Sequence, residues 1–160
     1  MIADSINLFF VFPLVLIVAA ISWIDIKTYR IPDVLNLTLF VLGTVFVILE
    51  DSMDLVSQVQ CALAIGFILW AVRFAFFHIR NKNALGLGDV KMGAASGMWI
   101  YLENLPLMFL IASGSALVTI LGLRLFGGNR FASMNVLPFG PYIGFSLLVV
   151  WSIQVSLVRF

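Results

Sequence analysis

The sequence predicts an all-α membrane protein of a single domain, residues 1–160, with about six transmembrane helices. Of its 160 residues, 62% are hydrophobic and only 11% are charged, and the mean hydropathy is +1.13. Soluble domains carry roughly 45–50% apolar and about 25% charged residues. Since a helix needs about 20 residues to cross a bilayer, the chain has room for five or six spans and short connections.

Six apolar stretches give the expected helices, at residues 6–24, 34–49, 59–77, 90–102, 105–126 and 136–158. The first follows Met-Ile-Ala-Asp-Ser, which has an acid and no basic residue, so we expect a retained span and not a signal peptide. The fourth is short, because residues 92–102 give about 16 Å of helix against roughly 30 Å of hydrocarbon. Its start is therefore expected below the bilayer surface. Within it Gly93 and Gly97 favour a close approach of helices, as do the small residues at 112–116.

The basic residues predict an orientation, because Lys and Arg collect on the cytoplasmic side of membrane proteins. In a six-span arrangement, all Lys and Arg residues except Arg159 fall on one side, at Lys27, Arg30, Arg73, Arg80, Lys82, Lys91, Arg124 and Arg130. The opposite side receives Asp4, Glu50, Asp51, Asp54 and Glu103. Both termini are therefore expected outside, and the three basic loops in the cytoplasm.

Charge and cysteine content exclude several classes of function. The net charge is +1, and the basic residues form no dense run with interleaved aromatics, so nucleic-acid binding is not expected. The one cysteine, Cys61, lies in an apolar run, which excludes an internal disulfide and a cysteine-based zinc site. We expect no metal and no cofactor.

Three carboxylates are expected at the cytoplasmic side: Asp25, Asp33 and Asp89. Carboxylates at a membrane edge are costly and by default indicate function. Each alone is also compatible with a helix cap, and Asp25 with an ion pair to Lys27 or Arg30. Two carboxylates at one depth on different helices are what an aspartyl protease needs, since one accepts a proton from water while the other, protonated, polarises the scissile carbonyl. This favours Asp25 and Asp89 as a catalytic pair.

The residues around Asp89 suggest further roles. Gly86 and Gly88 are expected to allow an extended backbone, for which positive φ is also open, with no side chain to block a peptide substrate. Lys91 lies on a different helix face from Asp89 and is expected to hold a lipid phosphate or to bias the carboxylates electrostatically. Asp33, which follows a proline, is expected to cap the second helix.

Pro138, Gly140 and Pro141 interrupt the start of the last span. Irregular backbone at membrane depth is tolerated where it is buried in protein or lines a wet cavity. Two interpretations follow: these residues shape a substrate cleft, or they form an ordinary helix start.

Three motifs, in this order, resemble the type IV prepilin peptidases, polytopic aspartyl proteases of the Gly-x-Gly-Asp class. They are Asp25 with Ile31-Pro32-Asp33, GLGDVK at 86–91 and LPFGPY at 137–142. The resemblance implies that Asp25 and Asp89 are the catalytic aspartates. It also implies that the substrates are prepilins or pseudopilins, whose basic leader is removed at the cytoplasmic face of the bacterial inner membrane.

Many members of that family carry an amino-terminal segment with two Cys-x-x-Cys pairs, associated with zinc binding and methylation. Here the first span begins within the first ten residues and the chain has one cysteine. We therefore expect peptidase activity without methyltransferase activity, as in the stand-alone peptidases of Flp/Tad-type pilus systems or of another secretion machine.

Two other classes of function remain open. A small transporter or channel subunit would use Asp25 and Asp89 as a proton or cation relay. A non-enzymatic assembly scaffold would need neither carboxylate.

Overall fold

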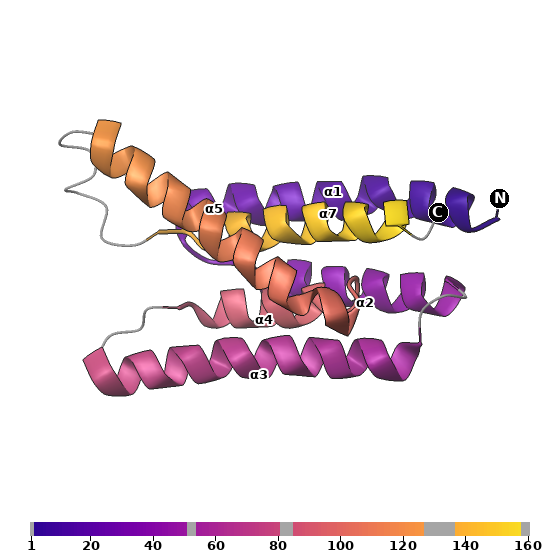
Figure 1. Cartoon of the computed structure of the whole chain (residues 1–160), viewed down its shortest axis with the longest axis horizontal. Helices are drawn as coiled ribbons and strands as arrows, with labels where there is room; N and C mark the ends of the chain where they lie inside the picture. The colour runs from indigo at the N-terminus through magenta and orange to yellow at the C-terminus, as the bar shows by residue number, and fades with distance from the viewer. Residues whose placement is uncertain (1, 51–53, 81–84, 127–136, 158–160) are drawn as a thin grey trace.

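The computed structural model describes residues 2–50, 54–80, 85–126 and 137–157, and these residues form helices with no strand among them (Figure 1). The helices are α1 (Ile2–Thr28), α2 (Asp33–Leu49), α3 (Leu55–Arg80), α4 (Leu87–Ser96), the short 3-10 helix η1 (Leu102–Asn104), α5 (Leu105–Phe126) and α7 (Gly140–Leu157). The all-α fold class is therefore confirmed. Some residues used above to orient the helices, namely Asp51, Lys82, Arg130 and Arg159, lie outside the described residues, as does residue 136, where the last apolar stretch begins.

Length and composition separate these helices into two groups. The described segments long and apolar enough to cross a membrane are Asn7–Thr28, Leu55–Ile79 and Leu102–Leu125. The helices at Asp33–Leu49 and Gly140–Ser156 are apolar but shorter. Helix α4 has 10 residues, or about 15 Å, which is half the thickness of a bilayer core. Six α-helices are described as expected, but three of them meet the length for a full span.

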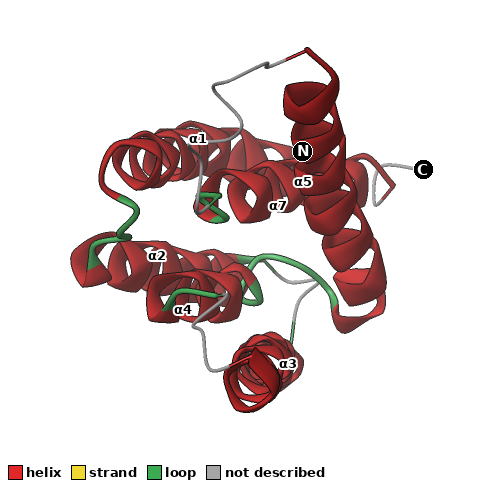
Figure 2. Ribbon diagram, turned by 90° about the vertical axis from the view of Figure 1, so that its left-hand side faces the viewer, coloured by secondary structure: helices red, strands yellow, loops and turns green. Residues whose placement is uncertain are grey.

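The helices form two layers joined side by side. Helices α1 and α7 lie together in one layer, and α2 and α4 in the other, with α3 packed against α4 (Figure 2). Helix α5 crosses α7 obliquely (Figure 1). The ends of α1, α3 and α5 and the starts of α2, α4 and α7 all lie toward one end of the bundle. That end is where the candidate carboxylates are found.

The core contains an aromatic cluster that joins the two layers. The Phe46 and Trp99 rings stack with centroids 5.4 Å apart, and Trp99 meets Trp151 edge to face at 6.2 Å. The indole N–H of Trp99 donates to the Leu39 carbonyl at 3.0 Å. Since Trp99 is fully buried, its hydrogen bond satisfies a donor that would otherwise be costly.

Glycines in α4 permit its close approach to α3. A Cβ on Gly93 would overlap the Leu69 side chain, and one on Gly97 would lie 2.5 Å from Ala62 Cα. The predicted role of this Gly-x-x-x-Gly in helix contact is therefore confirmed. Among the small residues of α5, Ala112 and Ala116 are buried, whereas a Cβ on Gly114 would have no neighbour within 4 Å.

Helix α4 ends at Ser96, earlier than the predicted 102, and the chain then turns inside the bundle. Buried glutamines satisfy the turning backbone. Gln154 of α7 accepts the Tyr101 N–H at 2.8 Å and the Asn104 side-chain amide at 3.2 Å. With its amide oriented to satisfy both groups, Gln58 of α3 donates to the carbonyls of Gly97 and Ile100, at 3.0 and 2.7 Å. The helix can break here because neighbouring helices supply the missing partners.

We expect Gln154→Leu to destabilise the bundle, because it leaves the Tyr101 N–H and the Asn104 amide without this acceptor. The loss of one hydrogen bond to a partly buried donor costs about 0.5–1.5 kcal/mol. The measurement is the melting temperature in detergent, beside Ser152→Ala, which alters an exposed hydroxyl on the same helix. Equal melting temperatures for Gln154→Leu and the parent would contradict the role of this glutamine.

Candidate active site

A cleft of about 740 Å³ opens between the end of α1, the start of α2 and the start of α4. The predicted site residues that line it are Asp25, Asp33, Gly86, Gly88, Asp89 and Lys91. Pro138, Gly140 and Pro141 lie outside its lining, but Gly140 contacts it through a hydrogen bond to Asp25. The structure thus brings together the two carboxylates that the sequence singled out.

Asp25 lies near the end of α1 and is 4% exposed. Its Oδ2 accepts the N–H of Gly140 at 3.0 Å. Gly140 is the first residue of α7, where backbone N–H groups lack partners within the helix and the dipole favours a negative charge. A Cβ on Gly140 would lie 2.8 Å from this oxygen, so the contact requires glycine. Lys27, considered as an ion-pair partner for Asp25, instead lies over the Trp23 ring, 4.2 Å from its centroid.

Asp89 lies in the first turn of α4 and is 9% exposed. Its Oδ2 accepts the N–H of Gly86, the N-cap residue, at 3.0 Å. This is the reciprocal half of a capping box, in which the third helical residue reaches back to the N-cap backbone. A Cβ on Gly86 would lie 2.9 Å from the same oxygen. Asp25 and Asp89 therefore each accept a hydrogen bond from a glycine N–H at a helix start.

The surroundings of Asp89 favour its protonated form. Asp89 lies at the start of α4, a helix too short to cross a bilayer. Burial in the cleft raises the pKa of Asp89 to about 6. The negative charge of Asp25 adds to this rise, and the hydrogen bond from Gly86 opposes it. The two carboxyl groups are thus close enough to influence each other's protonation.

The extended backbone expected at the glycines is present at Gly86, with φ −69° and ψ 149°, whereas Gly88 lies within α4. None of the glycines in the described ranges has a positive φ. The physical reason for Gly88 is a close approach, since its Cβ would lie 3.0 Å from Ile31 Cβ. The left-handed conformation falls instead on Tyr29, at φ 53°, where α1 ends. Its N–H donates to the Asp25 carbonyl at 2.8 Å, as in a helix C-terminal cap.

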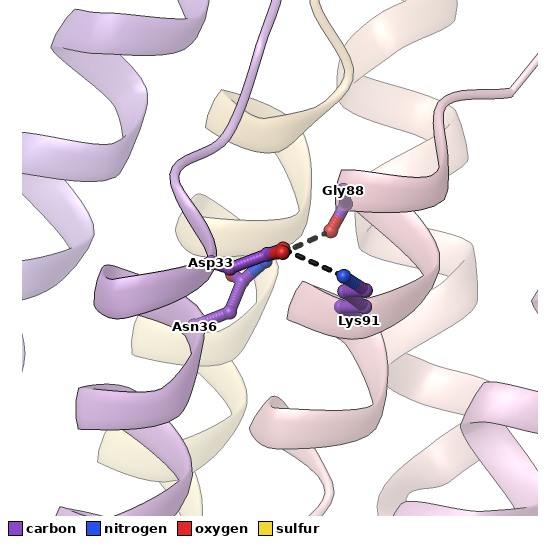
Figure 3. A network of polar contacts seen from close by, with 4 residues as sticks. All are labelled: Asp33, Asn36, Gly88 and Lys91. Atoms are coloured by element: carbon purple, nitrogen blue, oxygen red, sulfur yellow. Dashed lines mark hydrogen bonds and ion pairs between the residues drawn. The ribbon is translucent and has the colours of Figure 1, made fainter.

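Polar contacts connect α2 to α4 beside the cleft (Figure 3). Lys91 Nζ lies 2.7 Å from Asp33 Oδ1, and the Asn36 side-chain amide donates to the Gly88 carbonyl at 3.3 Å. The expectation that Asp33 caps α2 is wrong, because Pro32 occupies the N-cap position and makes no side-chain cap bond. The Lys91–Asp33 pair is more than half exposed, so it adds little stability. The proposed role of Lys91 toward lipid or the carboxylates stays a prediction.

Sequence reasoning missed two residues that the structure places at this site. Asn36 is 4% exposed and holds the backbone just before Asp89. The signal available in the sequence was an amide within an apolar run. Ile31 is 9% exposed and lies in the cleft against Gly88. It belongs to the Ile31-Pro32-Asp33 motif, but no role of its own was predicted for it.

Metal binding has no candidate site in the residues that the structure describes. Among them no group of three or more His, Cys, Asp or Glu side chains is arranged to hold an ion.

Comparison with known proteins identifies the family. The model of the type IV leader peptidase family matches residues 10–123. A prepilin leader peptidase/N-methyltransferase of Pectobacterium carotovorum subsp. carotovorum is 38% identical over 120 residues, which cover 75% of this chain and 42% of that protein. The proteins of the same name from Dickeya chrysanthemi and Escherichia coli (strain K12) are 35% and 34% identical, over 81% and 82% of this chain and 45% and 57% of their own lengths.

The chain spans about half the length of the curated relatives it matches. No solved structure matches it. The family model covers well over half of the chain, and its matched segment contains Asp25, Asp89 and the glycines before Asp89. The chain therefore belongs to the type IV leader peptidase family.

Proposed function

We propose that this chain is an aspartyl endopeptidase of the bacterial inner membrane that removes the leader peptide from type IV prepilins or pseudopilins. The observation that carries the proposal is the cleft in which Asp25 and Asp89, from α1 and α4, lie together. The family and the names of the relatives support the substrate class. The proposal concerns the peptidase part of those names.

The chemistry follows from one proton shared by two carboxyl groups. The ionised carboxylate takes a proton from a water molecule as its oxygen attacks the scissile carbonyl carbon. The protonated one donates to the carbonyl oxygen, which becomes a hydroxyl of the tetrahedral intermediate. The intermediate then collapses: one of its hydroxyls returns a proton to the carboxylate that had donated, the C–N bond breaks, and the leaving nitrogen takes the proton that the other carboxyl had received from water. The raised pKa of Asp89 favours the starting state with Asp89 protonated and Asp25 ionised.

The hydrogen bonds from Gly86 and Gly140 hold the two groups for this reaction. Each uses the Oδ2 atom of its aspartate and fixes the carboxyl plane relative to a helix start. A catalytic group held this way needs little reorganisation when substrate binds. Both contacts are made by main-chain donors, so they do not compete for the dyad proton.

The orientation of the bundle supports cleavage at the cytoplasmic face. The cleft lies at the end where α1, α3 and α5 finish (Figure 1). The basic residues Lys27, Arg73 and Arg124 lie in the later parts of these three helices. Since positive charge is retained in the cytoplasm, we propose that the cleft opens there and that both termini lie outside.

We expect Asp25→Asn or Asp89→Asn to reduce leader cleavage by about 10²–10⁴-fold, since each removes a group that transfers a proton. The chain is co-expressed with candidate prepilins from the same genome, and leader removal is measured by mass spectrometry. Glu103→Gln, which removes an exposed negative charge in η1, is the matched control and should cleave like the parent.

Undiminished cleavage by either aspartate variant would remove that residue from catalysis. Failure of the well-folded parent to cleave any of several prepilins would contradict the peptidase proposal. Ion flux in liposomes that is lost in the same two variants would then support the relay alternative.

Cleavage should also depend on pH in a defined direction. Because the pKa of Asp89 is raised to about 6, the dyad keeps its proton below that value and loses it as pH rises. We therefore expect kcat/KM in proteoliposomes to fall by about tenfold per pH unit above the upper pKa of the pair. A value that keeps rising up to pH 9 would contradict a shared proton.

Gly140→Ala should reduce kcat without unfolding the protein. The added methyl would lie 2.8 Å from Asp25 Oδ2 and 3.1 Å from Ile31 Cδ1, so the carboxylate must move. A displacement of about 1 Å at a reacting group costs up to 10²-fold in rate. Gly114→Ala is the control, because its methyl meets nothing within 4 Å. Equal kcat for the two variants would show that the Gly140 contact does not position Asp25.

A further inference from the structure

The loop between α1 and α2 places one apolar side chain between the two helix starts that hold the carboxylates. A Cβ on Gly88, directly before Asp89, would lie 3.0 Å from Ile31 Cβ and 3.5 Å from its backbone nitrogen. A Cβ on Gly140, which donates to Asp25, would lie 3.1 Å from Ile31 Cδ1. The opposite ends of the Ile31 side chain therefore face the starts of α4 and α7.

We propose that Ile31 is a positioning residue that sets the separation between the Asp25 and Asp89 carboxyl groups. The part of this inference that concerns rate rests on the proposed function, and the part that concerns separation does not. Ile31 lies where α4 and α7 would otherwise approach each other, and each of those helix starts carries the glycine N–H that fixes one carboxylate. Changing the thickness of this side chain changes the distance between the two anchors.

The loop is built to hold Ile31 rigidly. Tyr29, two residues before Ile31, adopts φ 53°, and its N–H donates to the Asp25 carbonyl. The start of the loop is therefore bonded to the last turn of α1, which also carries the Asp25 carboxylate. Pro32 after Ile31 has φ −62° and restricts Ile31 to extended backbone. The Pro32 carbonyl accepts the N–H of Asn36 at 3.3 Å, which connects the loop to α2.

The side chain itself suits a spacer. Its Cβ faces Gly88 and its Cδ1 faces Gly140, so the volume of the side chain from Cβ to Cδ sets the thickness that it presents to both helices. Gly88 and Gly140 leave room for it, since a Cβ on either would lie 3.0 or 3.1 Å from an Ile31 side-chain atom. An apolar group here also contributes to the desolvation of the cleft carboxyls without adding a competing donor. The pair of glycines and the isoleucine thus form one contact surface, built from residues 31, 88 and 140.

The first test measures separation and needs no activity. In a Cys61→Ala background, Asp25→Cys and Asp89→Cys introduce two thiols, which are joined in membranes by thiol reagents of graded length. With Ile31 present we expect one narrow range of lengths to react. Ile31→Ala should broaden that range and increase the yield at the shortest lengths at least threefold. Ile31→Leu, of equal volume, should stay within twofold of the parent.

The matched control is Ile65→Ala, which truncates an isoleucine that is fully buried in α3 and lies against Gly93, away from the cleft lining. It should leave the reactive lengths unchanged. If Ile31→Ala does not fold, Ile31→Val removes only Cδ1, the atom next to Gly140, and should shift the lengths partway. Unchanged lengths in both folded Ile31 variants would overturn the proposal.

The second test uses the intact aspartates. We expect Ile31→Ala to lower kcat for prepilin cleavage at least tenfold with KM within threefold, and Ile31→Leu to restore at least half of the parental kcat. Ile65→Ala should keep kcat within threefold. A lower kcat with unchanged reactive lengths would overturn the positioning role. If Ile31→Ala alters the reactive lengths in the double-cysteine protein but the parent chain cleaves no prepilin, the spacer role of Ile31 is supported and the proposed function is contradicted.

Discussion

A carboxylate removed from water needs hydrogen-bond donors, and the end of the bundle that holds Asp25 and Asp89 is arranged to supply them. Asp25 takes a donor from Gly140 and Asp89 takes one from Gly86, each at a helix start. The first of these bonds connects residues 115 positions apart, so α7 must run beside α1 and begin where α1 ends. The antiparallel pairing of these helices thus serves both the core and the cleft.

The short helix α4 positions the other carboxylate, Asp89. Its 10 residues begin at the cleft and end inside the bundle, where the chain turns into η1. Such a turn is tolerated because Gln58 and Gln154 bond its backbone, and because Trp99 fills the space beneath it. Glycines hold α4 against α3. The start of α4 is therefore supported from within the protein, and the Asp89 carboxyl lies at the level of Asp25.

Local properties of the sequence were sufficient to predict the helices and the carboxylate pair. The lengths of the apolar runs predict the helices. Each aspartate beside a membrane span can be recognised from its own sequence neighbours, without knowledge of the residue that it contacts. Contacts between distant segments were not predictable: Gly140 to Asp25, Asn36 to Gly88 and Ile31 to Gly88 join residues that no periodicity relates. For this reason Gly86 and Gly88 were assigned to backbone conformation, whereas in the structure Gly86 lies against Asp89 and Gly88 against Ile31. Asp33 was assigned to the N-cap of α2 because the sequence does not show whether Pro32 is itself the N-cap residue or the residue before it. In the structure Pro32 is the N-cap residue.

Capping and catalysis, which compete as explanations of Asp89 in the sequence, are compatible in the structure. As a cap, the carboxyl accepts the Gly86 N–H, and this bond lowers its pKa. As a buried group near Asp25, it is raised by desolvation and by like charge, and the sum is a pKa of about 6. A general acid is most effective when its pKa lies near the working pH, because it must both hold and release a proton. The capping bond therefore moderates the effect of burial, and the helix start that fixes the position of Asp89 also adjusts its acidity.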